Sequence, residues 1–92
     1  MSELEVFMSE QIKTLVPYYS TLELNAIVSA SSYSIEFFAV VNGKRMQCFE
    51  MIDNGIFSEK NFNIVSSNIA NYFRQLPDFD VNGVNRYAIN LK

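Results

Sequence analysis

Apolar residues recur every three or four positions over residues 4–16, which is the spacing of an amphipathic helix. Ser2 precedes this segment, and Glu5 lies three residues after it, as in a capping box. Pro17 follows, and proline cannot continue a helix. The pattern therefore predicts a helix over residues 2–16.

Beyond residue 22 the apolar residues recur at every second position. Two such runs, over residues 22–30 and 33–41, have the pattern of half-buried strands. Asn42-Gly43 follows the second run and favours a type I′ turn, because both central positions of that turn need a positive φ. The sequence thus predicts a hairpin whose returning strand covers residues 44–52.

A second helical stripe begins at Ser58 and ends at Pro77, and a last alternating run covers residues 86–91. The predicted order is α-β-β-β-α-β. The simplest way to bury every apolar stripe is one four-stranded, mostly antiparallel sheet with both helices packed on one face. We therefore expect the α+β class and a single domain over residues 1–92, since so short a chain has no room for a second core.

The predicted hairpin register places Phe38 beside Gln47 and Glu36 beside Phe49, on the face opposite the helices. The side chains predicted on this open face are Glu23, Ile27, Glu36, Phe38, Val40, Arg45, Gln47 and Phe49. Since both helices are needed on the other face, we expect these aromatic residues to form a docking surface for another protein. A homodimer seam, or a helix that wraps further round the sheet, is the structural alternative.

Composition removes most catalytic chemistry. The chain has no His and one Cys, whereas a Cys–His or Ser–His nucleophile needs an imidazole base and a zinc site needs several Cys or His ligands. Cys48 lies in the predicted third strand, and we expect a buried structural thiol there; a free reactive thiol is the alternative. We expect no enzymatic activity, catalytic residue, metal or cofactor.

The charge balance is acidic. Ten acidic residues outnumber seven scattered basic ones, for a net charge of -3, so direct binding to nucleic acid is not expected. The same acidity complements a basic partner surface. No apolar run approaches the roughly 20 residues of a membrane span, and the first residues are acidic rather than basic. We expect a soluble cytoplasmic protein that does not bind membranes.

Acidic residues also gather near the predicted turns. Glu50, Asp53 and Glu59 cluster around the end of the predicted third strand and the start of the second helix, and Asp78 and Asp80 bracket Phe79 in the last loop. Paired carboxylates can act as general acid and base when burial separates their pKa values. Turns and first helical turns favour acids for structural reasons, however, and we favour that interpretation over catalysis.

The layout resembles that of small bacterial immunity proteins, in particular the YezG-like kind and those paired with contact-dependent growth inhibition toxins. The resemblance covers most of the chain and rests on the element order, small size, acidity, Glu-rich first helix, Asn42-Gly43 hairpin and C-terminal segment 85–92 (NRYAINLK). It implies a non-catalytic cytoplasmic antitoxin that inhibits its cognate toxin, often a nuclease with a basic active-site cleft. It transfers no site residue by residue.

Under this hypothesis the partner-binding residues are aromatic anchors and complementary charges. The expected anchors are Phe38, Phe49 and Phe79, and the expected charges are Glu23, Glu36, Asp53, Asp78 and Asp80.

Two other functions stay open. A type III secretion chaperone is also small, acidic and dimeric and begins with an α-β-β-β-α pattern, but this chain ends one strand after the second helix and lacks a third helix. A chaperone is expected to clasp an extended effector segment as a homodimer, whereas an immunity protein binds one folded toxin. A structural subunit that assembles with itself through the sheet face is the third hypothesis.

Overall fold

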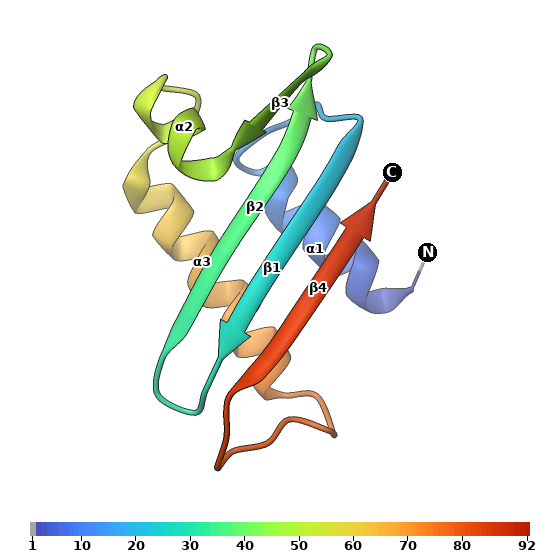
Figure 1. The fold of residues 1–92 in the computed structure, drawn as a ribbon, viewed down its shortest axis with the longest axis vertical. Coiled ribbons are helices and arrows are strands. Elements are labelled where there is room, and N and C mark those ends of the chain that lie inside the picture. Colours follow the sequence, from blue (N-terminus) through green and yellow to red (C-terminus); the bar gives the residue numbers. More distant parts are fainter. Residues whose placement is uncertain (1) are drawn as a thin grey trace.

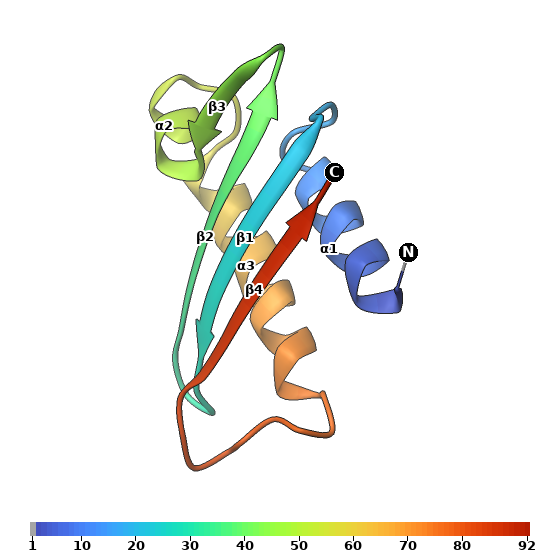
Figure 2. The same cartoon turned by 45° about the vertical axis from the view of Figure 1, so that its right-hand side comes forward.

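An antiparallel sheet with the strand order β3-β2-β1-β4 organises the chain (Figure 1). The structure is a computed structural model and describes residues 2–92. Its elements are α1 (Glu3–Lys13), β1 (Thr21–Val28), β2 (Tyr33–Val41), β3 (Lys44–Gln47), α2 (Cys48–Asp53), α3 (Glu59–Arg74) and β4 (Asn85–Leu91). Helices α1 and α3 lie on one face of the sheet, as the turned view of Figure 2 shows. The predicted α+β fold, with one sheet and both long helices on the same face, is confirmed.

Helix α1 begins with the predicted capping box. The Glu5 backbone N–H donates to the Ser2 hydroxyl at 3.1 Å, and the Ser2 N–H donates to the Glu5 carboxylate at 3.1 Å. These bonds to Ser2 lower the pKa of Glu5. The helix ends before the predicted boundary at residue 16, because the N–H groups of Leu15 and Val16 both bond to the Ile12 carbonyl and the chain turns there. Leu15 and Val16 are buried by this turn.

The hairpin between β2 and β3 is the predicted type I′ turn. Asn42 and Gly43 have φ values of 52° and 79°, both in the left-handed region. The turn sets the predicted register over four pairs: Val41 with Lys44, Val40 with Arg45, Ala39 with Met46, and Phe38 with Gln47.

The predicted strand over residues 44–52 is wrong beyond its fourth residue, where helix α2 begins. Strand alternation would turn Glu50 toward the helix side of the sheet, together with Cys48. Helical spacing instead buries Cys48 and Met51 completely and leaves Glu50 exposed. The predicted pairing of Phe49 with Glu36 is therefore absent, and Phe49 lies on α2 rather than on the sheet.

A Schellman motif ends α2. Gly55 has a φ of 74°, and its N–H donates to the Ile52 carbonyl at 3.0 Å. The N–H of Ile56 reaches back to the Met51 carbonyl at 2.9 Å. Residues 53–55 thus end a helix rather than a strand.

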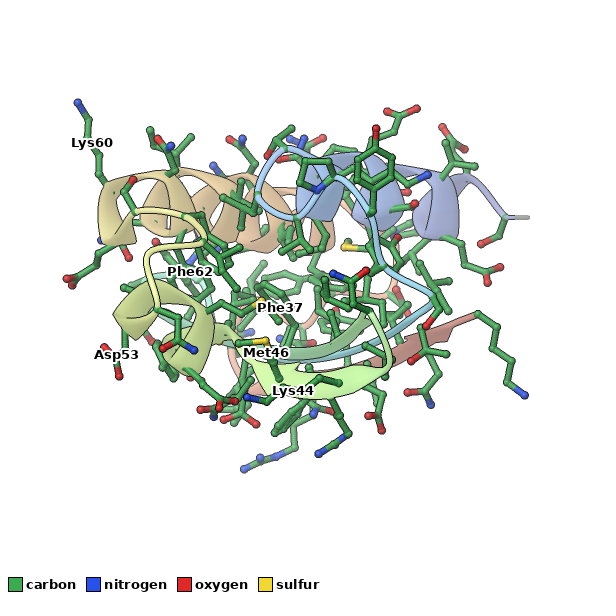
Figure 3. All side chains as sticks on the ribbon, turned by 90° about the horizontal axis from the view of Figure 1, so that it is seen from above. Phe37, Lys44, Met46, Asp53, Lys60 and Phe62 are labelled. Atoms are coloured by element: carbon green, nitrogen blue, oxygen red, sulfur yellow. The ribbon has the colours of Figure 1, made fainter. Side chains whose placement is uncertain are left out.

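The core lies between the sheet and the two long helices, as Figure 3 shows from above. Phe37 projects from β2 into its centre and is 0% exposed. Its ring centroid lies 6.0 Å from that of Phe57 and 6.1 Å from that of Phe62. Near the other end of the sheet, Phe73 stacks on Tyr87 with centroids 3.9 Å apart. Aromatic contacts therefore link the middle of the sheet to α3 and to the connection that precedes it.

The bend between β1 and β2 begins at Ser29, so β1 is shorter than the predicted strand over residues 22–30. The Ser29 N–H bonds to the Ser32 carbonyl at 2.9 Å. Arg74 at the end of α3 donates to the Ser29 carbonyl at 2.9 Å and to the Ser32 carbonyl at 3.1 Å. This arginine holds the bend against the helix layer.

Adjacent phenylalanines on β2 provide a test of the face assignment. We expect Phe37→Ala to lower the free energy of unfolding by about 3–5 kcal/mol, because it opens a cavity in the core. Phe38→Ala, on the opposite face, should cost only about 1 kcal/mol, since it removes one exposed cation–π contact and some half-buried area. Urea unfolding of the two variants measures both values, and equal losses would contradict the assignment.

Candidate protein-docking surface

The open face of the sheet carries a bonded set of polar side chains. The Arg45 Nε donates to the Glu23 carboxylate at 3.0 Å, and the guanidinium lies 4.1 Å from the centre of the Phe38 ring. Gln47 donates to the Glu36 carboxylate at 3.2 Å. Phe38 is only half-buried, because both long helices lie on the opposite face of the sheet (Figure 2).

The open face is close to neutral. Glu23 and Glu36 are balanced by Arg45 and by Arg86, which pairs with Ile27 across β1 and β4. Both carboxylates also have a partner within the chain. A basic partner therefore meets little uncompensated negative charge on this face.

The loop between α3 and β4 holds three of the expected partner-binding residues, Asp78, Phe79 and Asp80. The Asn85 side chain accepts from the Asp80 N–H at 2.9 Å and donates to the Asp80 carbonyl at 2.9 Å. Phe79 is half-buried and packs against the core. The pKa of Tyr87 is raised by burial and, to a lesser degree, by the charge of Asp78. This loop and α2 lie at opposite ends of the long axis of the molecule, which measures 40 Å (Figure 1).

A small hollow separates α2 from the first turns of α3. We call it the corner hollow; its volume is about 210 Å³, and its lining residues are Phe49, Ile52, Asp53, Glu59, Phe62 and Asn63. The rings of Phe49 and Phe62 meet edge to face, with centroids 5.6 Å apart. Phe62 is buried, whereas Phe49 is 47% exposed. The hollow therefore presents one accessible aromatic ring that is supported from below by another.

Local hydrogen bonds position both walls of the hollow. On one side, the Schellman motif at Gly55 ends α2 directly after Asp53. On the other side, Ser58 caps α3 by accepting the Asn61 N–H at 3.1 Å, which places Glu59 in the first helical turn. The positive end of the helix dipole stabilises the Glu59 carboxylate there.

The two carboxylates of the hollow have no ion-pair partner among residues 2–92. The ion pairs found in that range join Lys44 to Glu50 at 3.8 Å and Arg45 to Glu23 at 3.0 Å. Lys60 extends from α3 away from α2, and so away from Asp53 (Figure 3). The negative charge of Asp53 and Glu59 is therefore not compensated by a contact within the described chain.

The expected partner-binding residues thus separate into three places. Glu23, Glu36 and Phe38 lie on the open face, residues 78–80 lie in the last loop, and only Phe49 and Asp53 lie together at the corner hollow.

Two residues of this region, Glu59 and Ile64, were not among the expected partner-binding residues. Glu59 lines the hollow, and Ile64, 51% exposed, lines the adjoining surface of α3 together with Glu59 and Asn63. The signal for Ile64 was its position outside the apolar stripe of the helix, since a large apolar residue on the polar face of a helix is a candidate contact.

Cys48 is buried, as predicted, but on a helix rather than a strand. Its side chain is 0% exposed, and burial raises the pKa of the thiol above its ordinary value. A high pKa keeps the thiol protonated, and the protonated form is a poor nucleophile.

Comparisons of the chain with protein-family models, with curated proteins and with solved structures found no match. Within residues 2–92 there is no group of three metal-ligating side chains and no helix that is long and apolar enough to cross a membrane.

The thiol of Cys48 provides a test of its burial. We expect it to react with a disulfide reagent at pH 8 about 100-fold more slowly in the folded chain than in urea. Because the pKa is higher in the folded chain, the unfolded chain loses its proton first as the pH rises. The contribution of the protonated thiol to the free energy of unfolding is therefore fully present below about pH 8.5, the ordinary pKa of a thiol. It is lost as the pH rises through the pKa of Cys48 in the folded chain.

Urea unfolding between pH 8 and pH 10 measures this loss, with Cys48→Ala as the control that lacks the thiol. Equal pH dependence in the two chains would contradict the raised pKa of Cys48.

Proposed function

We propose that this chain is a non-catalytic protein-binding inhibitor, an immunity protein that neutralises a bacterial toxin by covering a basic surface around the toxin's active site. The observation that carries the proposal is the exposed Phe49 ring beside Asp53 and Glu59, two carboxylates without an ion-pair partner in the described chain. Exposed aromatic side chains on rigid supports supply much of the binding energy of protein interfaces. Uncompensated carboxylates select a basic partner.

The corner hollow is the centre of a wider surface. Ile56 follows α2 directly and Ile64 lies on the next turns of α3, and both are more than 40% exposed. A stable interface covers about 800 Å² on each partner, against 5594 Å² for this whole chain. The proposed interface therefore extends from α2 over the outer surface of α3, with apolar contacts near Phe49 and a polar rim of asparagines.

The choice of a toxin as the partner is supported by the resemblance in layout to small bacterial immunity proteins. A nuclease toxin binds phosphates with clustered Lys and Arg, so the surface that it presents to substrate is basic. The net charge of -3 and the free carboxylates of the corner hollow complement such a surface.

The exposed ring of Phe49 provides the first test. The protein that co-purifies with the native chain is identified and expressed in growing cells, with and without this chain. We expect the wild-type chain to restore growth and to form a one-to-one complex. Phe49→Ser should weaken the complex at least tenfold and lose the protection, because the ring is the central apolar contact.

The matched control is Tyr18→Ser, which removes an 86% exposed aromatic side chain from the connection between α1 and β1. It should protect as well as the wild type, and both variants should still unfold in one cooperative transition. A partner that does not arrest growth, or an extended segment held by a dimer of this chain, would contradict the proposal; the second result is the one a secretion chaperone predicts.

Electrostatic steering provides the second test. Raising the salt from 50 to 500 mM should slow association with the co-purified partner about tenfold, because salt screens the attraction between opposite charges. Asp53→Asn with Glu59→Gln should flatten this dependence. The control, Glu3→Gln with Glu10→Gln, removes the same amount of charge from α1. It should leave most of the salt dependence of the association rate unchanged. Stopped-flow association rates measure the effect, and an equal change in both double variants would contradict a local role of the hollow.

A further inference from the structure

We propose that the corner hollow receives one arginine side chain of the partner protein, whose guanidinium stacks on Phe49 and donates to Asp53 and Glu59. This inference rests on the proposed function, because it names the chemical group of the partner that the docking surface binds.

The size and lining of the hollow point to a single side chain. Its volume of about 210 Å³ is below the roughly 300–1,000 Å³ of sites that hold small-molecule ligands. The lining is partly aromatic, since Phe49 is accessible and Phe62 supports it at 5.6 Å. It is also acidic, since Asp53 at the end of α2 and Glu59 in the first turn of α3 line the same hollow. A cation with an apolar stem suits a lining that is both aromatic and acidic.

The chain itself contains this arrangement in a completed form. On the open face of the sheet, Arg45 lies 4.1 Å from the centre of the Phe38 ring and donates to Glu23 at 3.0 Å. The corner hollow has the corresponding ring and carboxylates, but no cation of residues 2–92 lies over the ring or pairs with the acids. The missing group is therefore a cation from outside the described chain.

Arginine fits this place better than lysine. A guanidinium is planar, so it can stack on a ring while its five N–H groups bond in the plane to more than one carboxylate. A lysine ammonium is a strongly hydrated point charge without a flat face, and it loses more hydration when it leaves water. Two lysines of the chain do not compete for this place, because Lys44 is paired with Glu50 and Lys60 extends away from α2 (Figure 3).

The experiment uses the isotope-labelled full chain and three blocked amino acids as probes, observed by amide NMR. N-acetyl-arginine amide should shift the signals of Phe49, Asp53 and Glu59 in a saturable way, with a dissociation constant of about 10–100 mM. N-acetyl-lysine amide should bind several-fold more weakly. N-acetyl-citrulline amide, which has nearly the same shape but no charge, should give no saturable shift at these residues.

Variants distinguish the contribution of the aromatic ring from that of the two carboxylates. Phe49→Ser and the double variant Asp53→Asn with Glu59→Gln should each abolish saturation, whereas Glu3→Gln with Glu10→Gln should retain the wild-type response. Unchanged signals from the sheet in every variant show that the fold is kept. Equal responses to arginine and citrulline, or arginine shifts confined to the open face, would overturn the inference.

The outcome is distinguishable from that of the proposed function. If Phe49→Ser abolishes toxin protection but arginine does not bind the hollow, the inhibitor proposal stands and the arginine inference is wrong. If arginine binds the hollow but the wild-type chain protects no cell from its partner, the inhibitor proposal is wrong and the arginine site stands.

Discussion

The packing of Phe37 against Phe57 and Phe62 determines where the candidate site stands. Phe37 is fully buried on a central strand, and the two rings that it contacts come from the connection before α3 and from α3 itself. The Phe62 ring in turn contacts the Phe49 ring edge to face. Because protein cores are close-packed, these rings hold α2 and α3 at one spacing, and the exposed ring is the outer end of the core cluster. An anchor supported in this way loses little conformational entropy on binding.

The structure offers two aromatic surfaces, and their charges separate them. On the open face of the sheet the charged groups bond to one another, so a partner must break those bonds or leave them unused. At the corner hollow the ring is exposed and Asp53 and Glu59 keep their charge available. Removing water from a carboxylate costs free energy unless a partner group replaces the lost hydrogen bonds and balances the charge. The open face thus has a cation over its ring, whereas no cation of residues 2–92 lies over Phe49 or pairs with the two acids of the corner hollow.

The early end of β3 shapes both the sheet and the site. β3 pairs with only four residues of β2, so the outer edge of β2 over residues 33–37 has no strand partner among residues 2–92. The same change of direction moves Phe49 off the sheet and onto α2. The short edge strand and the presentation of the ring are thus two consequences of one change in backbone conformation after Gln47.

Local chemistry in the sequence determined most of the secondary structure: the Ser2 and Ser58 caps, the Asn42-Gly43 turn, and the alternation that sets β1, β2 and β4. These features depend on residues only a few positions apart in the chain, so the sequence pattern alone can predict them. Only the tertiary structure decided that residues 48–53 form a helix. A short apolar run fits both the two-residue period of a strand and the 3.6-residue period of a helix, and the choice depends on which side chains the core buries. Tertiary packing also separated the expected partner-binding residues into three places and left Phe49 and Asp53 beside Glu59, since the meeting of α2 with α3 depends on contacts that no local spacing encodes.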